Sequence, residues 1–221
     1  IMSSVKTIIY LHGFLSSPAS LKGRVFGEKA RARGLTYKAP DLNVTDPRCL
    51  PFLLDDLLRG ESAESVAVIG SSLGGFYAAW LAGRRPVRTL LINPAVRPWL
   101  FVEKYLGEQK TADGRTLLIR PDFAQSLEAM RPGAFASPQQ VLVTVTTGDE
   151  VLDWHEALRA YPASPQYVIE GSDHAVSDID RYADALTDFL VNGTLPLKRA
   201  AISAGEAQKR ILSDNLRNER H

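Results

Sequence analysis

The sequence predicts an α/β fold, a doubly wound and mainly parallel sheet of about six or seven strands with helices on both faces. Short apolar runs rich in β-branched residues alternate along the chain with segments of helical periodicity, as in parallel βαβ units. Several of these runs are apolar at nearly every position, which is typical of strands covered on both faces. The chain has 221 residues, enough for one domain with a sizeable buried core.

The predicted strands and helices follow one another along the chain. The strands are Val5–Leu11, Leu35–Ala39, Val66–Gly70, Val87–Asn93, Val141–Thr146 and Gln166–Ile169. The helices are Ser20–Arg33, Cys49–Arg59, Leu73–Ala82, Asp153–Tyr161 and Ser177–Val191. Because crossover connections are right-handed, the carboxyl ends of parallel strands lie at the same edge of the sheet. Residues that follow strands are therefore expected to meet at that edge.

The connection from Pro94 to Gly133 is longer and has mixed signals. Trp99–Leu106 and Pro121–Met130 are predicted helices, and Thr111–Arg115, which contains Asp113-Gly114, is a predicted turn. We expect this connection to form a minimal cap over the site or no cap at all.

The polar end of the chain is set apart from the predicted domain, which spans residues 1–197. Few large apolar residues follow Pro196, and residues 198–221 are predicted to be a helical or flexible tail. The alternative for this tail is an oligomer contact, which gives a homo-oligomer as a predicted partner state.

Composition excludes several classes of function. The formal net charge of +1 argues against a dedicated nucleic-acid-binding protein, which carries a basic surplus. No apolar run approaches the roughly 20 residues of a membrane span, and the first residues lack the pattern of a signal peptide. We therefore expect no membrane partner and a cytoplasmic location. The single cysteine, Cys49, excludes an internal disulfide and is predicted to have an ordinary packing role.

The motif Gly70-Ser71-Ser72-Leu73-Gly74 indicates Ser72 as a nucleophile. The motif directly follows a predicted buried strand and precedes a predicted helix, the strand–turn–helix setting of a nucleophile elbow. Glycines avoid collisions in so tight a turn, and the serine projects beside a helix N-terminus, where free N–H groups favour negative charge. One alternative is a serine that only caps the helix. The other is a shift of register to Ser71, which lacks the flanking glycines.

The segment Tyr10-Leu11-His12-Gly13-Phe14 closes an earlier strand and is predicted to complete an oxyanion hole. Acyl transfer needs two backbone donors directed at the tetrahedral oxyanion. The N–H groups of Leu73 and Phe14 are the candidates, with Leu15 as the next choice. We expect His12 to brace this loop, and its alternative role is that of a catalytic base.

The candidate base is His174. It lies in Glu170-Gly171-Ser172-Asp173-His174, a loop that follows the last predicted strand and is able to reach a serine. His155 lies inside a predicted helix, and His221 is the terminal residue. His174 is therefore expected to accept the proton of Ser72.

The orienting acid is expected after the penultimate strand, since triads of this kind run in the order Ser, acid, His. Asp149 follows the strand-terminating Gly148 and is the favoured acid. Asp153 is the alternative, although a helix N-cap explains it equally well. Glu150 is expected to point to solvent.

With these residues the chain resembles the YqiA-like group of small bacterial esterases within the α/β-hydrolase superfamily. The resemblance spans residues 5–191 and is carried by five blocks in order: Tyr10–Pro18, Gly70–Ala78, Asn93–Pro98, Thr147–Asp153 and Ile169–Ala175. It implies the α/β-hydrolase fold, a Ser-Asp-His triad and esterase activity on small acyl esters. It also implies no metal and no organic cofactor.

The segment after the strand Val87–Asn93 is expected to border the same edge and to form the acyl pocket. The predicted pocket residues are Leu15, Tyr77, Asn93, Pro94, Val96, Arg97 and Trp99. Arg97 is a candidate for attracting a substrate carboxylate, with a solvated surface arginine as the alternative.

Together these features predict a serine hydrolase, a carboxylesterase or thioesterase that cleaves small soluble esters through an acyl-enzyme. The alternative is a non-catalytic ligand-binding or interaction protein on the same fold, because fold does not fix function.

Overall fold

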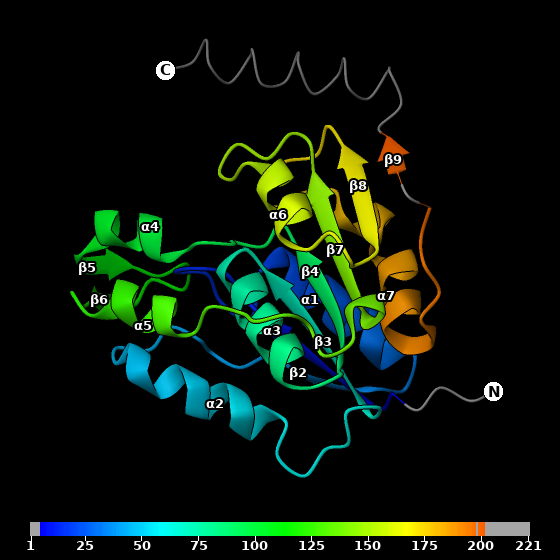
Figure 1. Ribbon diagram of the computed structural model, residues 1–221, viewed down its shortest axis with the longest axis horizontal. Helices are drawn as coiled ribbons and strands as arrows, with labels where there is room; N and C mark the ends of the chain where they lie inside the picture. The colour runs from blue at the N-terminus through cyan, green and yellow to red at the C-terminus, as the bar shows by residue number, and fades with distance from the viewer. Residues whose placement is uncertain (1–4, 198, 202–221) are drawn as a thin grey trace.

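A parallel sheet with helices on both faces forms the body of the protein in the computed structural model (Figure 1). The structure describes residues 5–197 and 199–201. Within these residues the sheet has seven strands, and every pair of neighbours is parallel. In spatial order they are β2 (Thr36–Lys38), β1 (Thr7–Leu11), β3 (Val66–Ser71), β4 (Arg88–Ile92), β7 (Val141–Thr146), β8 (Gln166–Glu170) and β9 (Arg199–Ala201). The predicted doubly wound α/β fold is confirmed.

Each face of the sheet carries its own apolar layer. Successive residues of β1 alternate between the layers, so that Ile8 packs into one and Ile9 into the other. The helices on the Ile8 face are α1 (Leu21–Ala32) and α7 (Ala183–Asn192). Those on the Ile9 face are α2 (Leu50–Leu57), α3 (Leu73–Arg84) and α6 (Trp154–Ala160). The strands are nearly all apolar because both alternating sets of side chains are removed from water.

The chain leaves the sheet between β4 and β7 and forms a small separate unit, at the left of Figure 1. This unit consists of α4 (Trp99–Val102), the 3₁₀ turn η2 (Glu103–Tyr105), the antiparallel hairpin of β5 (Gly107–Lys110) and β6 (Thr116–Ile119), and α5 (Phe123–Ala129). The predicted turn at 111–115 connects the two hairpin strands. The strands themselves are absent from the prediction, because β5 reads Gly-Glu-Gln-Lys and has no apolar residue.

Short 3₁₀ turns account for the other differences from the predicted helices. The predicted helix from Ser177 to Val191 divides into η4 (Ile179–Arg181) and α7, and η1 (Pro47–Cys49) precedes α2. A further turn, η3 (Pro138–Gln140), leads into β7. The predicted packing role of Cys49 is wrong: its side chain is exposed, because η1 buries Pro47 instead.

The start of the polar tail continues the sheet, since β9 pairs in parallel with β8. Residues 199–201 of the predicted helical or flexible tail are therefore a strand, because they pair with the edge of the sheet. Residues 198 and 202–221, and with them the rest of this prediction and its oligomer contact, lie outside the described residues. Among the helices that the structure describes, none is long and apolar enough to cross a membrane.

Close packing of α3 against the end of β1 requires a glycine at position 74. A Cβ added to Gly74 would collide with the Leu11 carbonyl oxygen. We expect Gly74→Ala to lower the free energy of unfolding by about 1–3 kcal/mol, because the backbone must shift to admit the methyl group. Denaturant unfolding of the purified variant measures this change.

Gly83→Ala in the same helix is the matched control. The atoms nearest to a Cβ added there are 3.5 Å away. Alanine is the better helix former, so stability should be unchanged or higher by up to about 1 kcal/mol. Equal stabilities for the Gly74 and Gly83 variants would contradict the packing described for α3.

Candidate active site

Ser72 occupies a strained turn between β3 and α3. Its φ is 56° and its ψ −118°, a region that residues with a Cβ rarely adopt. Backbone hydrogen bonds hold the turn: the Ser72 N–H donates to the Ile92 carbonyl (3.0 Å), and the Ser72 carbonyl accepts from the Ala95 N–H (3.0 Å). The serine is therefore fixed between its own strand and the loop that follows β4.

The glycines of the motif leave space for this turn. A Cβ at Gly70 would collide with the Gly74 carbonyl, and one at Gly75 would come within 2.7 Å of the Pro94 Cβ. Gly13, in the loop after β1, faces the serine, and a Cβ there would lie 3.3 Å from the Ser72 Cβ. Gly70 and Gly75 thus allow backbone approaches that a side chain would block, and Gly13 allows a tight contact with the serine.

A chain of hydrogen bonds connects Ser72, His174 and Asp149. The Nε2 of His174 lies 3.0 Å from the Ser72 Oγ, and its Nδ1 lies 2.8 Å from the Asp149 Oδ2. The Asp149 side chain is 1% exposed, and its other oxygen accepts from the N–H groups of Val151 and Leu152 (both 2.8 Å). These two donors hold the carboxylate in place, so that it accepts from Nδ1–H and leaves Nε2 free to accept from the serine.

The alternative acid, Asp153, lies away from this chain. It caps α6 and accepts from the N–H of His155 (3.0 Å) and from its Nδ1 (2.8 Å), as well as from Arg159 (3.0 Å). These contacts with its own helix account for Asp153 fully. Glu150, expected to point to solvent, is exposed and also accepts a hydrogen bond from the His174 N–H (2.9 Å).

The loop that carries His174 is attached to the sheet by Asn93. The Asn93 amide donates to the His174 carbonyl (3.1 Å) and to the Thr146 Oγ1 (2.9 Å), and its carbonyl accepts from the Thr146 N–H (2.9 Å). Asn93 is buried and has a φ of 41°. Predicted as a pocket residue, it lies instead behind His174, between the ends of β4 and β7.

His12 fixes the loop after β1 from within the core. Its Nε2 accepts from the Leu42 N–H (2.9 Å), so the proton lies on Nδ1, which donates to the Gly13 carbonyl (2.8 Å). Burial lowers the pKa of His12, which favours this neutral ring. Both ring nitrogens are engaged away from Ser72, and the side chain braces the loop.

The two predicted oxyanion donors flank the serine. Leu73 is the first residue of α3, and Phe14 lies in a turn closed by the hydrogen bond from the Ser16 N–H to the Gly13 carbonyl (3.1 Å). Within the described part of the chain, neither the Phe14 nor the Leu73 N–H donates to another protein group. A helix N-terminus with free amides favours negative charge.

A cavity of about 480 Å³ opens over Ser72 and His174. Part of its lining is aromatic, and the ring centroid of Phe14 lies 5.3 Å from that of Tyr105. The lining also carries hydroxyl and ammonium groups. The lining residues are Tyr10, Gly13, Phe14, Ser16, Ser20, Lys22, Ser71, Ser72, Phe101, Lys104, Tyr105, Val151, Leu152, His174 and Ala175. Among the side chains that the structure describes, no group of three or more His, Cys, Asp or Glu is placed to hold a metal ion.

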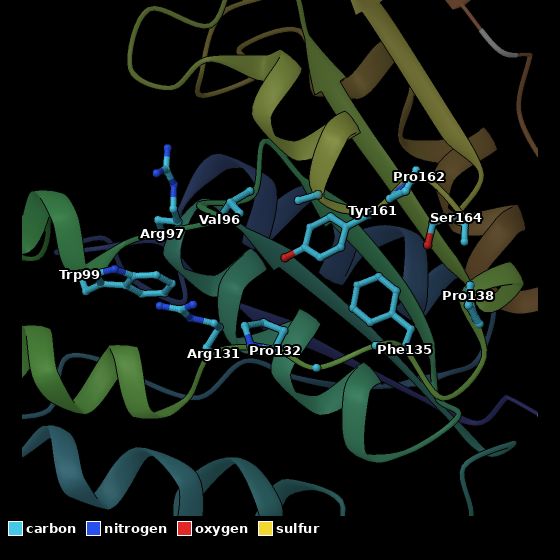
Figure 2. A pocket seen from close by; sticks show the side chains of 14 residues that line it. Val96, Arg97, Trp99, Arg131, Pro132, Phe135, Pro138, Tyr161, Pro162 and Ser164 are labelled. Carbon is cyan, nitrogen blue, oxygen red and sulfur yellow. The ribbon is translucent and has the colours of Figure 1, made fainter.

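Three of the predicted pocket residues line a different cavity, of about 490 Å³. Figure 2 shows Val96, Arg97 and Trp99 on one side of it, with Tyr161 and Phe135 further along. Pro94 packs against Gly75 of α3, and the segment that follows it lines this second cavity.

Side-chain contacts keep these residues in the second cavity. Arg97 is paired with Glu156 of α6 (2.5 Å), and the guanidinium of Arg131 covers the ring of Trp99 at 4.7 Å. Leu15 and Tyr77 likewise lie outside the lining of the Ser72 cavity, and Tyr77 is buried.

Single sequence motifs do not indicate the residues that line the Ser72 cavity from α1 and from the small unit. Phe101, Lys104 and Tyr105 approach it only because α4 and η2 fold back toward the sheet. Lys22 did carry a signal: it lies in the first turn of α1, where the helix dipole disfavours a positive charge. A cation in that position calls for an explanation beyond helix formation.

Comparison with known protein families identifies the family of this chain. The model of an uncharacterised protein family, UPF0227, matches residues 7–191. The chain belongs to this family. The match begins at the first residue of β1 and ends within α7, so it includes the whole of the Ser72 site.

Solved structures that include an esterase domain and an α/β-hydrolase domain-containing protein have the same fold. Est1E from Butyrivibrio proteoclasticus gives a TM-score of 0.64 at 16% identity and covers 85% of this chain and 88% of its own. The esterase domain of a Rhodothermus marinus protein gives 0.61 at 21% identity, with 84% and 85% covered. Alpha/beta hydrolase domain-containing protein 10 from mouse gives 0.60 at 20% identity, with 83% and 90% covered. The α/β-hydrolase fold implied by the sequence is therefore confirmed.

Proposed function

We propose that this protein is a serine hydrolase, a carboxylesterase or thioesterase that cleaves small soluble esters through an acyl-enzyme on Ser72. The observation that carries the proposal is the hydrogen-bonded chain from Ser72 through His174 to the buried Asp149, at the base of an open cavity. A serine hydroxyl is a weak nucleophile, and a base in hydrogen-bond contact with it, itself oriented by a carboxylate, is the arrangement that activates it.

In the acylation step, the Ser72 Oγ attacks the ester carbonyl carbon while His174 Nε2 takes the hydroxyl proton. The carbonyl oxygen becomes an oxyanion and accepts hydrogen bonds from the N–H groups of Phe14 and Leu73. When the tetrahedral intermediate collapses, the bond to the leaving alcohol or thiol breaks and His174 protonates that group. The acyl group remains on Ser72.

Deacylation repeats these steps with water as the nucleophile. His174 takes a proton from the water, whose oxygen attacks the acyl carbon, and then returns a proton to the Ser72 Oγ as the carboxylic acid leaves. Throughout, Asp149 keeps the proton on Nδ1 and stabilises the imidazolium. The donors to its second oxygen, the N–H groups of Val151 and Leu152, hold the carboxylate in place.

Ser72→Ala tests the nucleophile. We expect kcat on p-nitrophenyl acetate and butyrate to fall by about 10⁴- to 10⁶-fold, since nucleophile and base act as a unit. Ser62→Ala, an exposed serine before β3, is the matched control and should retain wild-type turnover. Undiminished turnover in Ser72→Ala would overturn the proposal, and absence of turnover in the wild type would favour a non-catalytic binding protein.

The pair Asp149→Asn and Asp153→Asn tests the assignment of the acid. In Asp149→Asn the amide no longer fixes the His174 tautomer, and we expect kcat to fall by about 10³- to 10⁴-fold. Asp153→Asn should leave kcat within about twofold, because asparagine is an equally good N-cap for α6. Steady-state kinetics on the same esters measure both, and a larger loss in Asp153→Asn contradicts the assignment.

A further inference from the structure

Lys22 is a buried cation on the wall of the Ser72 cavity. It lies in the first turn of α1, its residue is 9% exposed, and its Nζ donates to the carbonyl of Ala175, the residue after His174. An ammonium has three N–H donors. Among the described residues, the Ala175 carbonyl accepts from one of these three N–H groups. No described carboxylate lies within ion-pairing distance of the Nζ.

The charged groups of Lys22 and Lys104 line the cavity. Lys104 lines it from η2, and none of the described lining residues is Asp or Glu. Asp149 does not line the cavity, and its carboxylate is hydrogen-bonded to the His174 ring. A substrate entering the cavity therefore meets two ammonium groups and no carboxylate.

Support of the Ala175 carbonyl does not by itself require a charge. A neutral donor makes such a hydrogen bond without the desolvation penalty of a buried ion. The desolvation penalty affects Lys22, since burial lowers the pKa of its ammonium group to about 8. The negative charges of Asp173 and Asp149 raise this pKa and offset the effect of burial only in part. A buried cation that borders the nucleophile and lacks an anionic partner is suited to an anion supplied by the ligand.

We infer that Lys22 is a specificity-determining residue that binds a carboxylate of the substrate, so that the preferred substrates are esters or thioesters bearing a free carboxylate. This inference rests on the proposed function. One ammonium matches one carboxylate in charge, and the nearby hydroxyls of Tyr10 and Ser20, which bond to each other at 3.0 Å, add polar contacts on the same wall. The apolar wall around Phe14 and Tyr105 receives the rest of the molecule.

The test uses two pairs of esters that differ only in a carboxylate or a carboxamide. In the first pair, 4-acetoxybenzoate and 4-acetoxybenzamide, the group is on the alcohol side of the ester. In the second, monomethyl glutarate and methyl glutaramate, it is on the acyl side. The ratio of kcat/KM for the carboxylate to kcat/KM for the carboxamide is measured for the wild type and for Lys22→Met, which keeps the apolar stem.

We expect Lys22→Met to lower this ratio by about 10- to 100-fold for at least one pair, mainly through KM, as for loss of a charged hydrogen bond. Lys29→Met is the control: Lys29 lies on the same helix, pairs with Asp184 at 2.8 Å and does not line the cavity. It should leave the ratio unchanged. If Lys22→Met lowers both members of each pair equally, Lys22 only supports the His174 loop and the inference is overturned.

The pH dependence of the ratio gives a second readout. With a pKa of about 8, Lys22 is charged below pH 8 and loses its proton above it, so the carboxylate preference of the wild type should decline between pH 7 and 9. The carboxamide is the internal reference for the titration of other groups. Those that face Lys22 are Tyr10, Lys104, Asp149, Asp173 and His174.

The two proposals fail differently in this experiment. Wild-type turnover of the carboxamides without preference for either carboxylate overturns the inference on Lys22 and leaves the esterase proposal standing. Failure of the wild type to hydrolyse both p-nitrophenyl acetate and all four esters, with Ser72→Ala indistinguishable from it, overturns both.

Discussion

At Ser72 the backbone leaves β3 with a φ of 56° and enters α3 within one residue. A residue in such a conformation costs of order 1–3 kcal/mol, and it persists only where its surroundings determine it. Here the surroundings are the loop after β4, which bonds to both the N–H and the carbonyl of Ser72, and the end of β1, which packs against Gly74. The position of the hydroxyl thus depends on three adjacent parallel strands, and the position of every other group in the site is set relative to it.

The same strain recurs around the site. The described non-glycine residues with positive φ are Leu15, Ser72, Asn93 and Val176. They follow β1, β3, β4 and β8 respectively, so all of them lie at the carboxyl edge of the sheet. Asn93 connects two strand ends to the His174 loop, and Leu15 directly follows Phe14, which lines the Ser72 cavity. Strain gathered at one edge, on a sheet otherwise buried in two apolar layers, is typical of a preorganised site.

The sequence predicts the fold and the residues brought to Ser72 because both follow from local patterns: apolar runs mark buried strands, and parallel connections bring their ends to one edge. The pocket is different, since its lining depends on the path of the chain between β4 and β7. Packing of Pro94 against α3 directs Arg97 to Glu156, and the polar hairpin leaves no apolar signal in the sequence. The cations that line the Ser72 cavity, Lys22 of α1 and Lys104 of η2, lie outside the sequence motifs that indicate the triad.

Labelling with a serine-directed fluorophosphonate, followed by peptide mapping, tests most directly whether this geometry activates Ser72. The label reports the reactivity of the hydroxyl beside His174 and the helix N-terminus, and it needs no knowledge of the natural substrate. We predict one phosphonyl adduct, on Ser72, that forms in the folded protein and does not form after unfolding in urea. An unlabelled Ser72 in the folded protein, or equal labelling of folded and unfolded chains, would contradict the account.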